Sequence, residues 1–188
     1  AILALPLAVW RDVMAITDQS IRRQTTALDS VMSNLRGYYS DNVISRLSAD
    51  NPTVASHDYH AIDGAIPIPA TLAIELGELI NADQGTRGFN VEYRFISDFP
   101  FPGREPIELT AGENRALREF RNGHPENRMF LKADDSPWDH AVSMVTPVIM
   151  QDSCVACHNS HPNSPKTDWQ VGDNRGLQSF TVRLPIFS

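Results

Sequence analysis

The chain has 188 residues, 41% hydrophobic and 21% charged, which is the composition of a single globular domain long enough to bury a substantial core. Its 16 basic and 23 acidic side chains give a formal net charge of −7. This balance argues against nucleic acid as a partner and leaves no polybasic patch for a membrane surface.

Residues 1–10 are almost entirely apolar, but they are too few to span a bilayer, which needs about 20 residues. Trp10, followed by Arg11 and Asp12, is typical of the outer end of a transmembrane helix. We therefore expect residues 1–10 to be the end of a membrane anchor. The alternative is an apolar segment that packs on its own domain or on a partner.

Residues 11–48 contain no proline and a single glycine, Gly37. Apolar side chains recur at helical spacing, at Val13, Ile16, Ile21, Leu28, Val31, Met32, Leu35, Tyr39, Val43 and Leu47. The pattern predicts one amphipathic helix of about 55 Å, which is longer than a compact domain of this size needs. We expect part of this helix to pair with the same helix of a second protomer, giving a homodimer or a higher homo-oligomer.

Residues 49–188 form the predicted domain body. Asn51 and Pro52 end the long helix, and Pro67 and Pro69 impose an extended path. Helices are expected over residues 70–81, with Leu72, Leu76, Leu79 and Ile80 on the core face, and over residues 110–121. Strands are expected over residues 91–97, 127–132, 141–150 and 177–186. Helices followed by an antiparallel sheet make an α+β fold.

The pentapeptide Cys154-Val155-Ala156-Cys157-His158 uses both cysteines of the chain, so no structural disulfide is expected elsewhere. It has the spacing of a c-type haem attachment motif. Residues three and four apart share one face of a helical turn, so Cys154 and Cys157 can form thioethers with the two haem vinyl groups while His158 meets the iron. The motif predicts one covalent haem c. Because haem is joined to such motifs outside the cytoplasmic membrane, we expect a periplasmic or extracellular domain.

Three other interpretations of the motif remain open. His161 completes a Cys2His2 zinc set, although structural zinc sites usually gather ligands from two separated segments. A redox dithiol would need a βαβ pattern around it, which the sequence lacks. The third is chance.

Two segments resemble a known family. The run from Cys154 to Arg175 and the earlier Gly64-Ala-Ile-Pro-Ile-Pro-Ala-Thr71 are similar to periplasmic haem c, PAS-like sensor domains. In that family the domain commonly precedes cytoplasmic adenylate or guanylate cyclases, histidine kinases or chemotaxis modules. The resemblance implies sensing, a PAS-like antiparallel sheet and a haem-bearing C-terminal loop. A cysteine distal ligand is known in the family, but this chain has no third cysteine.

The sixth iron position is therefore open to other residues. His60, and after it His57, are the favoured imidazoles because imidazole suits iron. The remaining candidates are His124, His140 and the methionines Met14, Met32, Met129, Met144 and Met150, most of which are expected to fill the core. His161 is expected to make a hydrogen bond behind His158 or simply to shape the loop. An open position would admit a small, for example gaseous, ligand.

Haem propionates need hydrogen-bond donors, and Lys166, Trp169 and Arg175 follow the motif closely. The apolar side chains of the strand before the motif, Val142, Met144, Val145, Val148, Ile149 and Met150, are expected in the core.

No catalytic constellation stands out. Asp134-Asp135, Asp139-His140 and Ser153 lack a partnered nucleophile or an oxyanion context, so the sequence predicts no enzyme. The leading hypothesis is a monohaem sensor that responds to redox state or to a small haem ligand and is coupled to a membrane signalling protein. The first alternative is an electron carrier, either with its own redox partner or as a subunit of a larger cytochrome assembly. The second alternative is a protein that binds haem only for stability.

Overall fold

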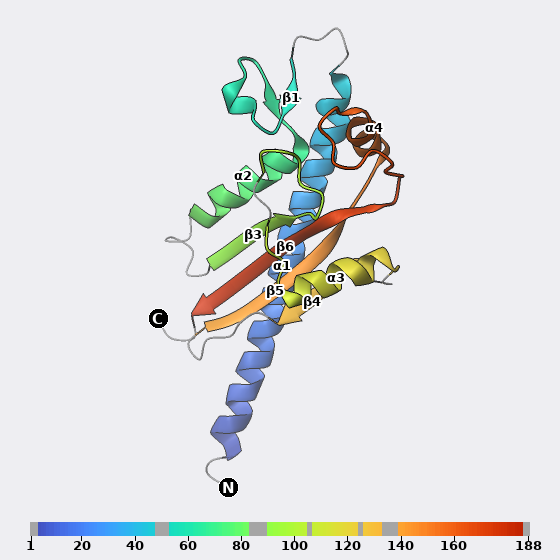
Figure 1. Cartoon of the computed structure of the whole chain (residues 1–188). Coiled ribbons are helices and arrows are strands. Elements are labelled where there is room, and N and C mark those ends of the chain that lie inside the picture. The colour runs from blue at the N-terminus through green and yellow to red at the C-terminus, as the bar shows by residue number, and fades with distance from the viewer. Residues whose placement is uncertain are drawn as a thin grey trace.

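A computed structural model describes residues 4–47, 53–82, 90–104, 107–123, 126–132 and 139–185 (Figure 1). The helices are α1 (Ala4–Asn42), α2 (Pro69–Ala82), α3 (Ala111–Arg121) and α4 (Asp152–Ser160), with 3-10 turns at Ile44–Arg46 and Tyr59–Ala61. The strands are β1 (Ala55–Ser56), β2 (Ile66–Pro67), β3 (Asn90–Ile96), β4 (Met129–Lys132), β5 (Asp139–Ile149) and β6 (Asn174–Pro185). The predicted mixture of helices and strands, with a long N-terminal helix and an antiparallel sheet, is confirmed.

The long helix α1 begins at Ala4, before the predicted start at Arg11, and ends at Asn42, before the predicted end at Ser48. Pro6 is tolerated because it lies in the first turn, where a backbone N–H has no intrahelical partner. At the other end the Asn42 side chain donates to the Tyr38 carbonyl (3.0 Å). Within the described ranges, none of the helices combines the length and the apolar character needed to cross a membrane.

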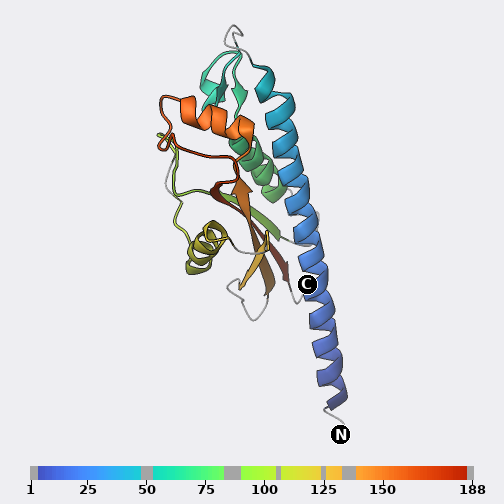
Figure 2. The same cartoon turned by 90° about the vertical axis from the view of Figure 1, so that its right-hand side faces the viewer.

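The four-stranded sheet has the order β3-β6-β5-β4, and every neighbouring pair is antiparallel. Successive side chains point to opposite faces of a strand, and both faces are covered. The face that bears Tyr93, Val142 and Phe180 packs against α1 and α2 through a cluster that includes Ile21 and Met32. The opposite face packs against α3, giving three layers. Figure 2 shows α1 running along one side of the sheet and its N-terminal part extending past it.

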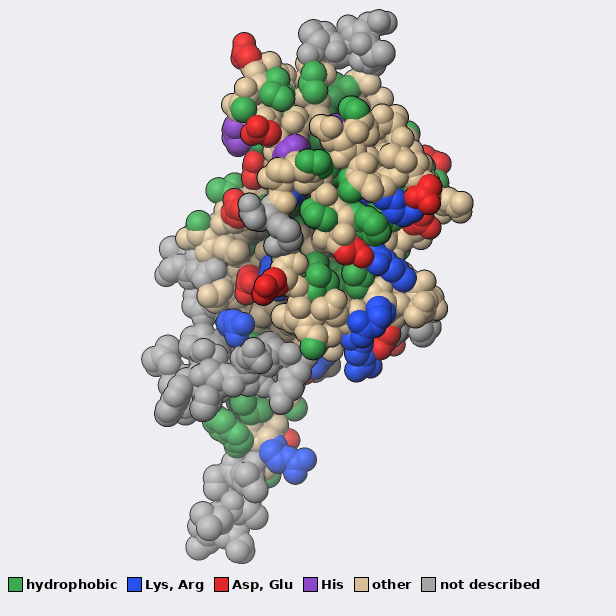
Figure 3. All heavy atoms as spheres, in the orientation of Figure 1, with side chains coloured by type: hydrophobic (Ala, Val, Ile, Leu, Met, Phe, Trp, Pro, Cys, Tyr) green, Lys and Arg blue, Asp and Glu red, His purple; other side chains and the backbone are tan. Residues whose placement is uncertain are grey.

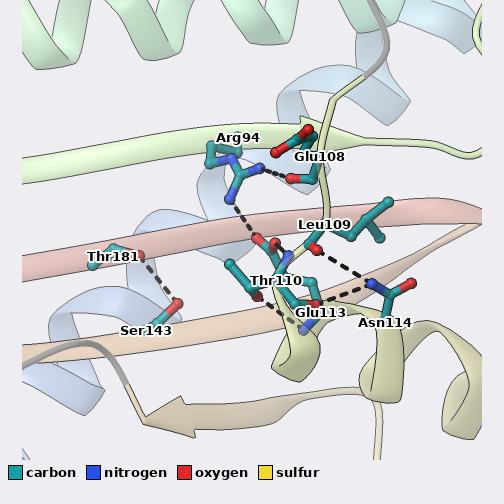
Figure 4. Close-up of polar contacts among 8 residues, drawn as sticks. All are labelled: Arg94, Glu108, Leu109, Thr110, Glu113, Asn114, Ser143 and Thr181. Carbon is teal, nitrogen blue, oxygen red and sulfur yellow. Dashed lines mark hydrogen bonds and ion pairs between the residues drawn. The ribbon is translucent and has the colours of Figure 1, made fainter.

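The helix α3 is held on β3 by a buried carboxylate. Thr110 and Glu113 form a capping box at the start of α3, and the Glu113 side chain also accepts from Arg94 (2.8 Å). Arg94 donates in addition to the Glu108 carbonyl (2.9 Å), as Figure 4 shows. Glu113 is only 3% exposed. These contacts fix the N-terminal end of α3 against β3.

A buried polar cluster joins α1 to the sheet. Gln178 of β6 is 0% exposed. Its side-chain carbonyl oxygen accepts from Arg36 (2.6 Å), and its side-chain NH2 donates to the Ser33 hydroxyl (2.6 Å) and to the Asp29 carboxylate (2.5 Å). Thr146 of β5 also donates to Asp29 (2.6 Å). Because a buried polar group is costly unless it is hydrogen-bonded, this cluster fixes the position of α1 along the sheet.

Two predicted core positions are wrong. Leu79 is 67% exposed, because α2 approaches the sheet through small residues: a Cβ added at Gly77 would lie 2.4 Å from the Tyr93 ring. Ile149 is 47% exposed because it follows an irregularity in the β5–β6 register between Val148 and Ile149. The other predicted core residues of β5 and Met150 are buried.

Candidate functional site

The Cys-x-x-Cys-His motif forms the middle of α4, in the connection between β5 and β6. Cys154, Cys157 and His158 are three and four residues apart and therefore share one face of this helix. Both cysteines are free; Cys157 is exposed and Cys154 partly so. Partial desolvation by the surrounding protein raises the pKa of the Cys157 thiol, and the nearby Cys154 thiol raises it further. A reactive redox dithiol needs a lowered thiol pKa, so this environment disfavours that interpretation.

The imidazole of His158 faces inward from α4. Its ring centroid lies 5.3 Å from that of Phe101 and 6.5 Å from that of Trp169. Burial, with smaller effects of Arg175 and His161, lowers the pKa of His158 to about 4. The imidazole is therefore neutral at pH 7, which is the form that coordinates a metal. Its Nδ1 is buried and has no hydrogen-bond partner among the described residues.

The three residues predicted to bind haem propionates lie together: the cationic groups of Lys166 and Arg175 are both close to the ring of Trp169. The Lys166 Nζ is 4.7 Å and the Arg175 Cζ 5.4 Å from its centroid. Trp169 is 5% exposed, and Asn159 of α4 holds its backbone from both sides. Asn159 donates to the Trp169 carbonyl (2.9 Å) and accepts from the Trp169 N–H (2.9 Å).

The region beside Trp169 is electropositive. Arg175 is 6% exposed and donates to the Ser97 hydroxyl and to the Phe99 carbonyl (2.6 Å). Its pKa is lowered to about 10, mainly by burial; Asp98 opposes the shift, whereas Arg104 and Arg121 add repulsion. The Arg175 Nε is buried without a partner among the described residues. Buried guanidinium groups with spare donors suit an anionic ligand.

The loop of residues 97–104 connects His158 to the segment that carries the predicted distal ligands. Phe101 contacts His158, and a Cβ added at Gly103 would lie 3.6 Å from the His57 Nε2. His57 is half-buried. By contrast, the His60 side chain is 75% exposed, and its Nε2 lies 3.4 Å from the Glu75 carboxylate. Of these two candidate distal ligands, His57 is thus the one beside the loop that contacts His158.

His161 does not support His158 by a hydrogen bond. Its Nδ1 accepts from the Asn163 backbone N–H (3.1 Å), and its ring meets the edge of Phe101 at 5.2 Å. Its N–H caps α4 by donating to the Cys157 carbonyl (2.9 Å). These contacts shape the loop, the second of its two predicted roles.

The predicted methionine ligands lie mainly in the core. Met32, Met144 and Met150 are 2%, 1% and 2% exposed, and Met129 packs on the cluster under α3. Met14 is half-buried on α1. Outside the described residues lie His124, the pair Asp134-Asp135 and the side chains of Asp139 and His140.

The zinc interpretation is not supported by the arrangement of side chains. No three His, Cys, Asp or Glu side chains in the part of the chain that the structure describes are placed to hold a metal ion together. All four residues of the Cys2His2 set, Cys154, Cys157, His158 and His161, belong to that part.

Ser153 links α4 to the C-terminal end of α1. Its hydroxyl lies 2.9 Å from the Ser40 hydroxyl and donates to the Asp41 carboxylate (3.2 Å). The residue before Ser40, Tyr39, donates to the Pro67 carbonyl of β2 (2.8 Å). The end of α1 therefore contacts both the motif helix and the segment that carries His57.

Sequence reasoning missed Phe101, Arg104 and Asn159. Asn159 directly follows the motif, but a single asparagine after a motif gives no indication of its partner ten residues on. Phe101 and Arg104 lie in a proline-rich loop, and only the tertiary structure brings this loop to α4 and α2, where Arg104 donates to Thr71 (2.5 Å).

Comparison with known proteins gave one result. A family model described as Tll0287-like matches residues 14–183, from α1 through most of β6. No match was found among curated proteins or among solved structures.

Proposed function

The chain belongs to the Tll0287-like family, and from this membership we propose that it is a sensor domain with one covalent haem c on a PAS-like fold. The observation that carries the proposal is the face of α4 on which Cys154, Cys157 and His158 lie together. We propose a sensing rather than an enzymatic role, because the family is one of sensor-type domains.

Each thiol would add across one haem vinyl group: a sulfur–carbon bond forms at one vinyl carbon, and the thiol hydrogen goes to the other. His158 would bind the iron through Nε2, because its imidazole is neutral and its Nδ1 is buried. A haem bound in this way supplies an iron that can exchange an electron or a small ligand.

The surroundings of His158 fit this group. Trp169 and Phe101 provide apolar contact, and the spare Nε donor of Arg175 suits a propionate. For the sixth position we retain His60, and we rank His57 above it. His57 lies beside Gly103 in the loop that also contacts His158, whereas His60 is paired with Glu75.

We propose that the haem state reaches the membrane through α1. Ser153 binds Ser40 and Asp41, so a displacement of α4 acts on the end of α1. The opposite side of α1 has an exposed apolar stripe at Val9, Val13, Ile16, Val31, Leu35 and Tyr38. Such a stripe suits pairing with the same helix of a second protomer. The domain would lie outside the cytoplasmic membrane, tethered to it, ahead of a signalling module.

The first experiment tests the haem. The mass of the denatured protein should exceed that of the chain by one haem, and the added mass should disappear in Cys154→Ala/Cys157→Ala. His158→Ala should change the iron absorption while the covalent haem is retained. A chain without added mass, or one with bound zinc, would refute the attachment.

The second experiment separates a sensor from an electron carrier. The electron carrier is the second candidate function because Cys157 is exposed, and a haem attached there would have an edge open to a redox partner. Spin labels at Ala15 should report a distance between protomers that changes between the oxidised and reduced protein. In Ser153→Ala the haem should remain but the change should shrink. If the distance between the spin labels changes neither with redox state nor with added ligand, the electron carrier would be favoured.

A further inference from the structure

A cavity of about 360 Å³ lies beside the haem region, where the end of α3, the end of β5 and the loop between α4 and β6 meet. This volume lies within the range of small-molecule sites. Neither cysteine lines the cavity, and His158 does not line it either. Figure 3 shows hydrophobic side chains on this face, between α3 and that loop, bordered by Lys and Arg side chains with Asp and Glu side chains beside them.

The walls of the cavity are aromatic. Phe99, Phe120 and Trp169 line it, together with the exposed Ile149. Phe99 meets Trp169 edge-on, with 5.5 Å between ring centroids and an angle of 86°. An edge-to-face pair of this kind leaves ring surface available for a further aromatic group.

The polar atoms at the cavity are mainly donors. Asn174 is 8% exposed; its carbonyl oxygen accepts from the Gly176 N–H (3.0 Å), which leaves its NH2 buried and unpartnered among the described residues. A buried amide without a partner needs an explanation, and an acceptor on a ligand supplies one. The lining carboxylate, Asp173, already accepts from the Gln170 N–H (2.9 Å).

Lys166 is the cation best placed to bind an anion there. Its ammonium lies 4.7 Å from the Trp169 ring and pairs with Asp168, whose side chain is 84% exposed. An ion pair with such an exposed partner is worth little, so Lys166 can turn to a ligand at small cost. Arg121, the other lining cation, is committed to Asp98 through both terminal nitrogens (2.7 and 2.8 Å).

We propose that this cavity binds a small aromatic carboxylate. Its ring would lie between Phe99, Phe120 and Trp169, and its carboxylate would accept from Lys166 and from the Asn174 amide. Cys154, Cys157 and His158 lie outside the cavity, whereas Lys166 and Trp169 line it and are also predicted contacts of the haem, so the proposal is tested with any haem in place.

Calorimetric titration of the protein as isolated, with any haem in place, tests the proposal. The probe is 2-naphthoate, with the neutral 2-naphthylmethanol for comparison. We expect saturable one-to-one binding of naphthoate and clearly weaker binding of the alcohol. Lys166→Met should weaken naphthoate binding about tenfold, the loss of one charge-assisted hydrogen bond. Arg118→Met, which removes a positive charge from α3 outside the cavity, should change it less than twofold.

Ile149→Trp places a large ring at the cavity and should abolish binding of the probe; because Ile149 is exposed, the variant should still fold. Equal affinities for naphthoate and for the alcohol would overturn the proposal. An affinity for naphthoate that Lys166→Met leaves unchanged would also overturn it. Binding of naphthoate only to protein that lacks haem would overturn it as well, since the cavity would then belong to the haem site.

Discussion

Replacing Asn159 by alanine removes the two hydrogen bonds by which α4 holds Trp169. The side-chain amide both donates to and accepts from the Trp169 backbone, at 2.9 Å in each case. Trp169 is 5% exposed, so in the variant water does not simply replace Asn159 as the hydrogen-bond partner of its backbone N–H and C=O. An unsatisfied buried group costs about 1–3 kcal/mol, and a hydrogen bond contributes about 1 kcal/mol net. We therefore expect Asn159→Ala to lower the free energy of unfolding by about 2–4 kcal/mol.

Urea unfolding followed by far-ultraviolet circular dichroism measures this change. For a chain of this length, 1 kcal/mol corresponds to about 2–4 °C, so the melting temperature should fall by about 5–15 °C. The matched control is Asn163→Ala, the same substitution at an exposed position of the loop that follows α4, which should cost less than about 0.5 kcal/mol. Equal unfolding midpoints for the two variants would show that Asn159 does not hold Trp169.

Four further substitutions test the packing of α1, α2 and the loop after β3. Gln178→Leu leaves the charged side chains of α1 without their buried partner and should cost about 3 kcal/mol in urea unfolding; a cost below about 1 kcal/mol would refute the polar cluster. Gly77→Ala should cost about 2 kcal/mol because its Cβ meets the Tyr93 ring at 2.4 Å, whereas Gly37→Ala, with nothing within 4 Å, should gain up to about 1 kcal/mol. Burial alone would raise the pKa of Asp98, but its hydrogen bonds with an arginine hold it below the ordinary value of 3.8. The paired carboxylate therefore stabilises the fold above pH 3.8 and less as the pH falls below it. Asp98→Asn should lower the unfolding midpoint more at pH 7 than at pH 3, and an equal loss at both would contradict this.

Local patterns predicted the elements that depend on local sequence. The 3.6-residue periodicity identified α1 and α2, the capping box accounts for the start of α3, and alternation identified the strands. The motif spacing placed both cysteines and His158 on one helix. The two-residue strands β1 and β2 are too short to give any alternation.

What the sequence could not give depends on contacts between distant segments. Nothing near Leu79 indicates that α2 packs through Gly77, because the close approach of Tyr93 is a tertiary contact. The exposure of Ile149 follows from the register irregularity opposite β6. His57 and His60 are three residues apart with the same chemistry, and only the positions of Gly103 and Glu75 distinguish them.

The way α1 is held has a mechanical consequence. Its deeply buried side chains, Ile21, Thr25 and Met32, lie near the middle of the helix, while Ser40 touches α4 and the N-terminal part extends past the sheet (Figures 1 and 2). At 1.5 Å per residue, the arm from this fulcrum to Ser40 is about 20 Å and the arm to Ala4 about 34 Å. The helix is a lever with unequal arms: a tilt that displaces Ser40 by about 1 Å displaces Ala4 by about 1.7 Å in the opposite direction.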